Sequence, residues 1–249
     1  MNSKFTGAVV VLASAAMLAA GCGAKDDANG AAPAAQATSA GPATNGVEAL
    51  EGEQILQKAK AALKAAPSYH TKGKAAEDGS KYEFDLKAAK DDVLAEIVLD
   101  GAKVELLQVT GKRYFRADAK FWAMTTGGKA QGDAFAKVLG KRWVVVKPGD
   151  KSTEDMFAFA DVEEILAPDG KVTKGTAKEV DGKPAIGLLD DGAEGGTMWI
   201  ATTGEPYPLR IEAKDPAQGG SVFDQFGATF PELKAPAAAD VIDIDKLKK

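Results

Sequence analysis

The spacing of apolar side chains along the chain changes at Pro67. Residues 48–66 place apolar side chains three and four positions apart, which is the spacing that one face of an α-helix buries. These side chains are Leu50, Ile55, Leu56, Ala59 and Leu63. Proline ends a helix because it lacks a backbone N–H and clashes with the preceding turn. The sequence therefore predicts one helix over 48–66.

Beyond this helix the pattern becomes that of strands. Over 81–87, apolar residues alternate with charged ones, which is typical of a strand with one face toward solvent. Similar runs recur about every ten residues, and turn pairs such as Asp100–Gly101 and Asp181–Gly182 separate them, which predicts consecutive antiparallel hairpins. The further predicted strands are 93–99, 104–109, 113–117, 142–147, 172–180, 183–189, 197–202, 209–214 and 221–230, with an edge strand within 241–244.

Two shorter helices are expected to interrupt the strands, at 133–139 and 153–166, and Ser152 is suited to cap the second. Many antiparallel strands with few helices predict an α+β fold in which helices cover the concave face of a curved sheet. We expect one domain over 47–249. The alternative is two smaller α+β units divided near Gly170.

The first residues have the pattern of an export signal. Lys4 supplies a positive start, residues 5–20 are apolar or small, and small residues precede Cys22. The apolar run is shorter than the roughly 20 residues of a transmembrane helix. We expect residues 1–21 to be a signal peptide that is removed on export.

The residues around Cys22 resemble a bacterial lipobox, in which the cysteine becomes the first mature residue and carries diacylglyceryl on its sulfur. Ala20 and Gly21 fit this motif, whereas Ala19 stands where Leu is commoner. Cys22 is the only cysteine of the chain. Lipidation of Cys22 is therefore predicted. The alternative is a soluble secreted protein, cut elsewhere, with a free thiol.

Residues 23–46 contain mostly Ala, Gly, Pro, Ser and Thr and no large apolar side chain. Such a segment cannot bury enough surface to offset its ordering entropy, so we expect a disordered tether after Cys22. Its mean span would be roughly 25 Å. The region from Cys22 to residue 46 would thus hold the folded domain close to the membrane.

Composition narrows the function further. The chain has 31 basic and 36 acidic residues, a formal net charge of −5, which argues against a nucleic-acid partner. Without the signal, which removes Lys4, the net charge is 30 − 36 = −6, so an acyl anchor rather than attraction to anionic lipids must hold the protein at the membrane. One cysteine and one histidine exclude an internal disulfide and a cysteine/histidine zinc site.

The candidate catalytic groups are best explained as surface residues. His70 is expected at a half-exposed position near the start of a strand, without a second ligand for a metal. The adjacent carboxylates Asp91–Asp92, Asp190–Asp191 and Glu163–Glu164 are expected on solvated turns or helix surface, since neighbouring strand residues point to opposite faces. The sequence thus predicts no enzyme, no catalytic or metal site and no cofactor.

Many interior positions are expected to hold Ala, for example Ala88, Ala95 and Ala185. Small side chains on a curved sheet have two explanations. They leave an open volume that a ligand fills, or the core is well filled and its composition has merely shifted toward small residues. Packed interiors normally contain few voids. The sequence leaves both explanations open.

Part of the chain resembles a known family. Residues 199–212, WIATTGEPYPLRIE, are similar to the LppX/LprA/LprF/LprG lipoproteins, and so are residues 235–243 and the strand around Trp143. The resemblance covers 48–249 in order, with residues 199–212 as its specific part. It implies a fold similar to LolA and LolB, a highly curved antiparallel half-barrel with helices across its hollow. Family members hold acylated lipids or glycolipids in that hollow.

The resemblance thus implies a lipid-anchored lipoprotein on the extracytoplasmic face of the cell membrane, which binds an acylated lipid or glycolipid for transport or presentation across the envelope. The alternatives are a sensor or interaction domain that binds an envelope protein and carries no cargo, and a structural lipoprotein with a closed core. The residues expected to line the cavity, from alternation along the strands, are Phe84, Leu86, Ile97, Leu99, Leu106, Val145, Met198 and Ile200.

Overall fold

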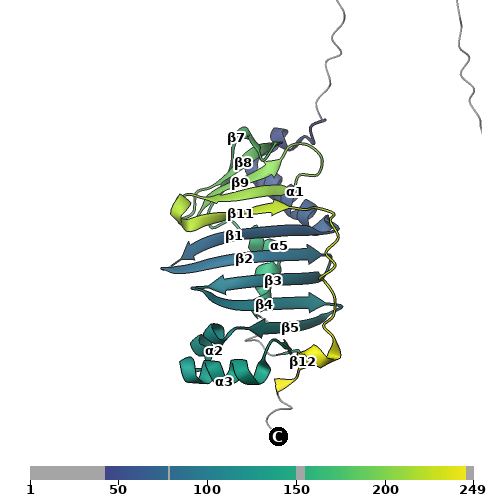
Figure 1. The fold of residues 1–249 in the computed structure, drawn as a ribbon. Coiled ribbons are helices and arrows are strands. Elements are labelled where there is room, and N and C mark those ends of the chain that lie inside the picture. The colour runs from purple at the N-terminus through teal and green to yellow at the C-terminus, as the bar shows by residue number, and fades with distance from the viewer. Residues whose placement is uncertain (1–42, 78, 150–154, 245–249) are drawn as a thin grey trace, which may run out of the picture. The chain divides into compact units, whose positions relative to one another are not determined.

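The structure, a computed structural model, describes residues 43–77, 79–149 and 155–244, which belong to one compact unit. The predicted signal peptide, Cys22 and most of the predicted tether lie outside the described residues. The fold is α+β, with helices packed on one open, curved sheet of twelve strands, as the sequence predicted (Figure 1). The sheet runs continuously through strands on both sides of Gly170, so two units divided near that residue are not observed.

The strands are β1 (Tyr69–Glu77), β2 (Ser80–Ala89), β3 (Asp92–Leu99), β4 (Ala102–Val109), β5 (Lys112–Ala117), β6 (Trp143–Val145), β7 (Val172–Val180), β8 (Lys183–Asp190), β9 (Gly196–Ala201), β10 (Pro208–Ala213), β11 (Gly219–Asp224) and β12 (Val241–Ile242). Their order in the sheet is β12-β6-β5-β4-β3-β2-β1-β11-β10-β9-β8-β7. Neighbours are antiparallel except β12 and β6, which run parallel.

The α-helices are α1 (Gly52–Ala65), α2 (Ala119–Thr126), α3 (Lys129–Leu139) and the single-turn α5 (Val162–Ile165). Short 3₁₀ turns are η1 (Val47–Ala49), η2 (Asp155–Ala160), η3 (Pro216–Gln218) and η4 (Ala238–Asp240). None of the described helices is long and apolar enough to cross a membrane.

One face of the sheet, which we call the inner face, carries the main core. Register places Leu86, Ala95, Leu106 and Phe115 side by side across β2 to β5, and all four are buried. The same buried cluster contains the apolar stripe of α1, whose Ile55, Leu56, Ala59 and Leu63 are at most 1% exposed. Since the apolar face of a helix must pack against another apolar surface, α1 and the inner face cover each other.

The opposite, outer face is covered only in part. One small buried cluster there contains Trp199 and Leu209, and a second contains Leu107, Tyr114 and Trp143. Segment 225–244 contributes Leu233 and Val241 to the second cluster. The outer face therefore has separate apolar patches between charged rows, whereas the inner face has one continuous core.

The chain path explains how the inner face is covered. β1 lies between β2 and β11 in the middle of the sheet, and β2 to β6 extend from it toward one end. The chain returns through η2 and α5, which place Phe157 and Val162 in the inner core, and then forms β7 at the opposite end. In Figure 1, α1 and α5 both lie behind the sheet. The covering helices are thus the first element and the crossover of the fold.

The predicted helices differ from the observed ones in detail. α1 begins at Gly52 rather than at residue 48, because Glu51 and Gln54 form a reciprocal capping box there. α2 was not predicted; the Asp118 side chain starts it by accepting a hydrogen bond from the Phe121 amide. The predicted helix 153–166 is interrupted, because Asp161 is extended and its side chain caps α5 through the Glu163 amide.

The folded unit includes the end of the predicted tether. Thr44 forms a β-bridge with Thr203, and the Asn45 amide donates to the Thr202 carbonyl over 2.8 Å. The Asn45 side chain also donates to the carbonyls of Ala201 and Gly204. The chain therefore joins the sheet at β9, a few residues before the predicted boundary at residue 47.

Core packing on the inner face predicts a large difference between two leucines. Leu106 is fully buried in the inner core, whereas Leu189 is 45% exposed. Leu106→Ala should lower the free energy of unfolding by about 2–5 kcal/mol, because it leaves a cavity in the core. Leu189→Ala, the matched control, should change it by less than about 0.5 kcal/mol. Urea unfolding of both variants measures this, and equal effects would contradict the assignment of the inner face as the core.

Candidate functional site

A cleft of about 500 Å³ opens on the inner face, at the end of the strands where β1, β3 and β5 begin and β2 and β4 end. The last turn of α1 forms one wall, and η2 with the first residues of α5 forms the other. We call it the end cleft. Its lining residues are Leu63, Lys64, Ala66, Tyr69, Ala88, Lys90, Asp91, Val93, Gln108, Arg113, Phe157, Ala158, Ala160, Asp161 and Val162.

The floor of the end cleft is apolar. Seven of its lining residues are buried and carry apolar or aromatic side chains from α1, β1, β2, β3, η2 and α5. These seven are Leu63, Ala66, Tyr69, Ala88, Val93, Phe157 and Val162. Small Ala side chains on β2 and at the end of α1 leave the space that larger residues would fill. The base of the cleft is therefore apolar and largely closed to solvent.

The rim of the cleft is polar, and hydrogen bonds hold some of its side chains in place. The Arg113 guanidinium donates through Nε to Gln108 Oε1 over 2.7 Å and lies 5.2 Å from the centre of the Phe157 ring. Gln108 in turn donates to the Asp91 carbonyl over 2.7 Å. Lys90, in the left-handed conformation of the β2–β3 turn, also lines the opening. The hydrogen bond and the aromatic ring hold the guanidinium beside the apolar floor.

Tyr69 places a phenol within this cleft. Burial, followed by the negative charge of Asp161, raises the pKa of Tyr69 to about 12. The phenol therefore stays neutral at physiological pH. It adds a polar hydroxyl to the floor without adding a charge.

A carboxylate joins α5 to α1 beside the cleft. Glu163 Oε2 accepts a hydrogen bond from Lys60 Nζ over 2.8 Å, and Glu163 Oε1 accepts one from Lys64. The bond from Lys60, followed by that from Lys64, lowers the pKa of Glu163 to about 2. We call this arrangement the Glu163 latch, because it holds the crossover against α1.

None of the eight residues predicted to line the cavity lines the end cleft. Leu86, Leu106 and Ile200 are fully buried within the inner core. Ile97 and Met198 are partly buried and pack against that core. Phe84 and Leu99 share the inner face by register and are partly buried. The Phe84 ring covers Gly73, and Phe84 is the one predicted residue that lines the second hollow described below.

The predicted facing of Val145 is wrong. Register pairs Val145 with Tyr114, and both belong to the apolar cluster on the outer face, whereas Val144 belongs to the inner core. β6 is three consecutive apolar residues, Trp143–Val145, so its sequence contains no alternation that reveals which side chain points inward. The α1 side chains that meet the inner face are at most 1% exposed, and the end cleft lies at the end of that face.

Some of the lining residues that the sequence analysis did not assign to the cavity lie at strand ends. Ala88 follows Leu86 by two positions on β2, and Val93 precedes Ala95 by two on β3, so both share the inner face. Continuing the predicted alternation to the last residue of each strand would have found them. The same alternation identifies Arg113, which precedes Phe115 by two positions on β5. No periodic signal identifies Phe157, because η2 is irregular.

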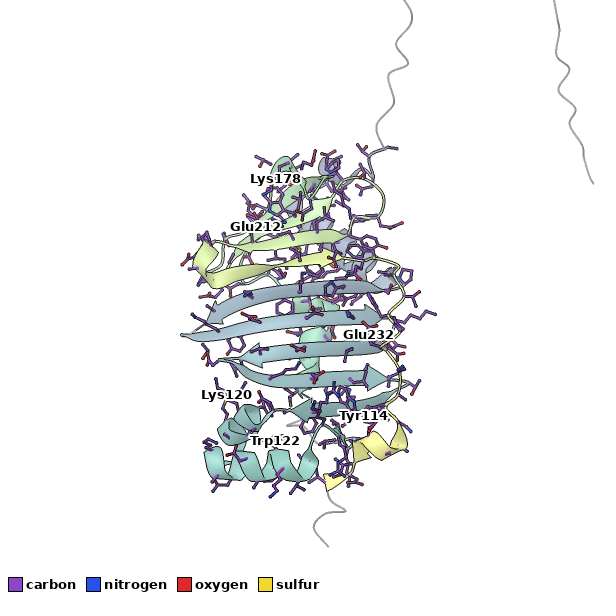
Figure 2. All side chains as sticks on the ribbon, in the orientation of Figure 1. Tyr114, Lys120, Trp122, Lys178, Glu212 and Glu232 are labelled. Carbon is purple, nitrogen blue, oxygen red and sulfur yellow. The ribbon has the colours of Figure 1, made fainter. Side chains whose placement is uncertain are left out.

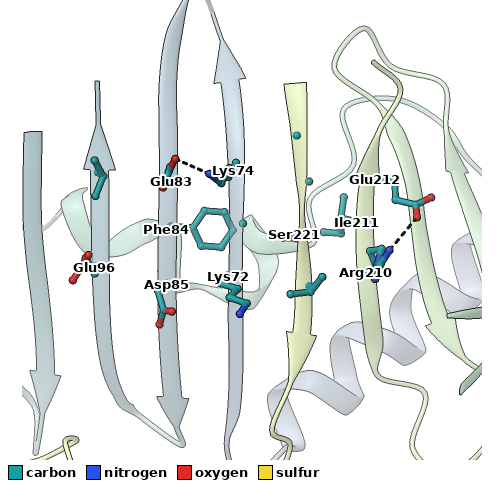
Figure 3. A pocket seen from close by; sticks show the side chains of 15 residues that line it. Lys72, Lys74, Glu83, Phe84, Asp85, Glu96, Arg210, Ile211, Glu212 and Ser221 are labelled. Atoms are coloured by element: carbon teal, nitrogen blue, oxygen red, sulfur yellow. Dashed lines mark hydrogen bonds and ion pairs between the residues drawn. The ribbon is translucent and has the colours of Figure 1, made fainter. Parts of the chain in front are cut away.

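A second hollow, of about 630 Å³, crosses β3, β2, β1, β11 and β10 on the outer face (Figure 3). Charged side chains line it, and most of these charges are neutralised locally. Lys74 donates to Glu83 over 2.8 Å, and Arg210 lies 2.7 Å from Asp181, outside the hollow. Its charged lining residues are Lys72, Lys74, Arg210, Glu83, Asp85, Glu96 and Glu212. Apolar atoms nevertheless make up most of its surface, and Val98, Ile211 and Val222 are among its lining residues.

The expected surface position of His70 is wrong. His70 is only 4% exposed, and side chains of β2, β11 and Gln225 lie around its ring. Its Nδ1 lies 2.6 Å from Asp224 Oδ1, and its Nε2 lies 3.2 Å from Asp85 Oδ1. The Nδ1 bond joins β1 to β11, whereas Nε2 has no hydrogen-bond partner among the described residues. Among the described residues, no group of three or more His, Cys, Asp or Glu side chains could hold a metal ion.

Carboxylates of the adjacent pairs Asp91–Asp92 and Asp190–Asp191 accept hydrogen bonds from backbone amides. Asp92 accepts a hydrogen bond from the Thr110 amide. Asp190 accepts from the amides of Asp169 and Gly170, and Asp191 from that of Lys171. These bonds close turns at the ends of strands and helices, which is a structural role.

The Glu163 latch predicts faster local opening when its charge is removed. In Glu163→Gln at neutral pH, the amides of Ile165 and Leu166 should exchange with deuterium faster than in the parent chain, because α5 loses two charge-assisted bonds to α1. Glu164→Gln is the matched control, since no ion pair involves Glu164 within the described residues. Equal exchange in the two variants would contradict the latch.

The same latch has a defined pH window. The pKa of Glu163 is lowered from 4.5 to about 2, so its stabilising effect is complete above pH 4.5 and is lost as the pH falls toward 2. Hydrogen exchange of α5 should therefore accelerate between these values in the parent chain but not in Glu163→Gln.

Comparison with known proteins finds no matching family model and no similar curated protein. Among solved structures, LprF from Mycobacterium bovis is similar with a TM-score of 0.41 and 16% identity, over 75% of this chain and 97% of LprF. Lipoprotein LppX from Mycobacterium tuberculosis has a TM-score of 0.41 and 13% identity, over 72% and 97%. An uncharacterized conserved protein from Thermus thermophilus has a TM-score of 0.38 and 11% identity, over 77% and 98%. LprF and LppX are members of the family that the sequence resembles.

Proposed function

We propose that this protein is a lipoprotein, anchored through Cys22 at the extracytoplasmic face of the membrane, that binds an acylated lipid or glycolipid for transport or presentation. The observation that carries the proposal is the end cleft, which combines a buried apolar floor with a polar rim. An acyl chain matches the floor, and a polar headgroup matches the rim. The export signal and the lipobox-like sequence around Cys22 support the location.

The physical requirement for such a carrier is an apolar site that an acyl chain can enter. Transfer of a sixteen-carbon chain out of water is favourable by roughly 12 kcal/mol, so a carrier must offer an apolar site of comparable quality. The end cleft, at about 500 Å³, lies within the usual size range of ligand sites. Its floor would contact the chain through Leu63, Val93 and Phe157.

The rim would orient the headgroup. Arg113 is held in place by Gln108 and by the ring of Phe157, and its Nη atoms have no carboxylate partner among the described residues. The neutral Tyr69 phenol offers a further hydrogen bond. These groups bind and position a polar group. The proposal therefore assigns binding, rather than bond making or breaking, to the site.

A blocked cleft should no longer take up an acyl chain. Ala160 lies on η2 in the wall of the end cleft and is partly buried, so Ala160→Trp should place an indole in the cleft and weaken the binding of a fluorescent fatty acid by about tenfold or more. Val98→Trp, on the outer face, is the matched control and should bind as the parent chain does. Fluorescence titration measures both, with thermal melting to verify folding.

Native mass spectrometry of the protein purified from its own host gives a second readout. A bound acyl species in the parent chain that is absent in Ala160→Trp is expected. A ligand-free mass, together with equal fatty-acid titrations for both Trp variants, would refute the proposal and favour an interaction domain. The charged hollow of the outer face would then be the surface to test for an envelope protein.

The anchor predicts a separate change. Cys22→Ser removes the only thiol of the chain, so the protein should lose its diacylglyceryl group and move from the detergent phase to the aqueous phase on detergent partitioning. Mass spectrometry of the parent chain should show a mature N-terminus at Cys22 that carries lipid. A mature parent chain without acyl mass would contradict the proposed anchor. It would not bear on the proposed binding in the cleft.

A further inference from the structure

The α2–α3 hairpin concentrates exposed apolar side chains. Within the described residues, four large apolar side chains are exposed, and three of them belong to this hairpin. They are Met124 at 50%, Phe135 at 39% and Val138 at 54% exposure; the fourth is Leu189 at 45%. The hairpin lies at the β5–β6 end of the sheet (Figure 1). Its apolar exposure is therefore a local property and not a general feature of the surface.

The hairpin is nevertheless well ordered. Trp122 is buried and lies between Phe115 of β5, at 5.7 Å between ring centroids, and Phe135 of α3, at 5.5 Å. Figure 2 shows Trp122 where the hairpin meets the sheet. Gly132 brings the two helices into backbone contact, since a Cβ there would lie 2.5 Å from the Ala123 nitrogen. The exposed side chains thus stand on a rigid support.

The same segment is basic although the chain is acidic. Residues 118–142 contain five basic and two acidic residues, a net of +3, against −5 for the whole chain. Both carboxylates already have partners within the hairpin. Asp118 caps α2, and Asp133 pairs with Lys129 over 2.6 Å.

The other four basic groups have no carboxylate partner within the described residues. Lys120 donates to the Asp100 carbonyl, and Arg142 donates to the carbonyls of Val138 and Leu139 at the end of α3. Lys137 and Lys141 are exposed. Lys137 is the neighbour of Val138, and Lys141 follows it by three residues. The C-terminal half of α3 therefore presents apolar side chains next to uncompensated positive charge.

We propose that the α2–α3 hairpin docks on an anionic lipid bilayer, with Phe135 and Val138 at the boundary between headgroups and acyl chains and Lys137, Lys141 and Arg142 against lipid phosphates. Exposed apolar residues beside lysines are what a helix at the membrane interface requires. Polybasic clusters are attracted to anionic leaflets. This contact is distinct from the acyl anchor, and it does not require that the end cleft holds a lipid.

The length of the N-terminal segment permits this contact. The chain joins the sheet at β9, seven strand-to-strand steps from β5, which is roughly 34 Å at the usual strand spacing. Residues 22 to 43 span at most about 75 Å when extended. An anchor at Cys22 therefore leaves the domain free to place the hairpin on the same bilayer.

A site-specific fluorophore tests the proposal in the full chain. The Cys22→Ser background removes the anchor and the only native thiol, so Val138→Cys and Leu189→Cys can each be labelled singly with an environment-sensitive dye. Vesicles contain phosphatidylcholine alone or mixed with phosphatidylglycerol. We expect the dye at position 138, but not at 189, to shift to the blue and to be quenched by nitroxide lipids in the anionic vesicles.

Charge variants complete the test. Lys137→Gln with Lys141→Gln should weaken this vesicle binding by about fivefold for each lysine. Lys171→Gln with Lys183→Gln, two exposed lysines elsewhere, should leave it unchanged. Equal responses at positions 138 and 189, or no loss in the first charge variant, would overturn the proposal. A concentration-dependent shift at 138 without vesicles would also overturn it, because the patch would then bind a second copy of the chain.

Discussion

The fold depends on burying one face of an open twelve-stranded sheet. Such a face is stable in water only when other elements cover its apolar side chains. Here α1 covers the region near β7 and β8, and the crossover η2–α5 joins it in the inner core. The side chains of α1 that meet the sheet are almost fully buried, so the centre of the inner face is a closed core. Everything proposed for the cleft follows from where this cover ends.

The cover ends at the strand termini near α1's last turn, and the end cleft lies there. Its floor is the continuation of the core, with Ala88 and Val93 in place of larger residues, and its wall is the crossover itself. The Glu163 latch then ties that wall to α1. In the proposed function, an apolar group enters this site while the rest of the core stays intact. The charged groups lie on the rim because the floor is part of the buried core.

Periodicity in the sequence predicts much of this architecture. Alternation in β2 to β5 and the helical spacing before Pro67 identify the long elements, because each has one wet and one dry face. Periodicity fails where an element is short or uniformly apolar, as at Val145 in β6. It also fails for His70, whose burial depends on β11, a strand about 150 residues later in the chain. The position of the cleft was not predictable either, since it results from how far α1 and η2 extend over the sheet.

The most direct test of the account is photo-crosslinking with a fatty acid that carries a diazirine on its acyl chain, followed by peptide mass spectrometry. The account predicts labelled peptides that contain the cleft residues Leu63, Val93 and Phe157, with competition by unlabelled lipid. Labelling of the outer face around Lys72 and Arg210 instead, or labelling that unlabelled lipid does not reduce, would contradict it.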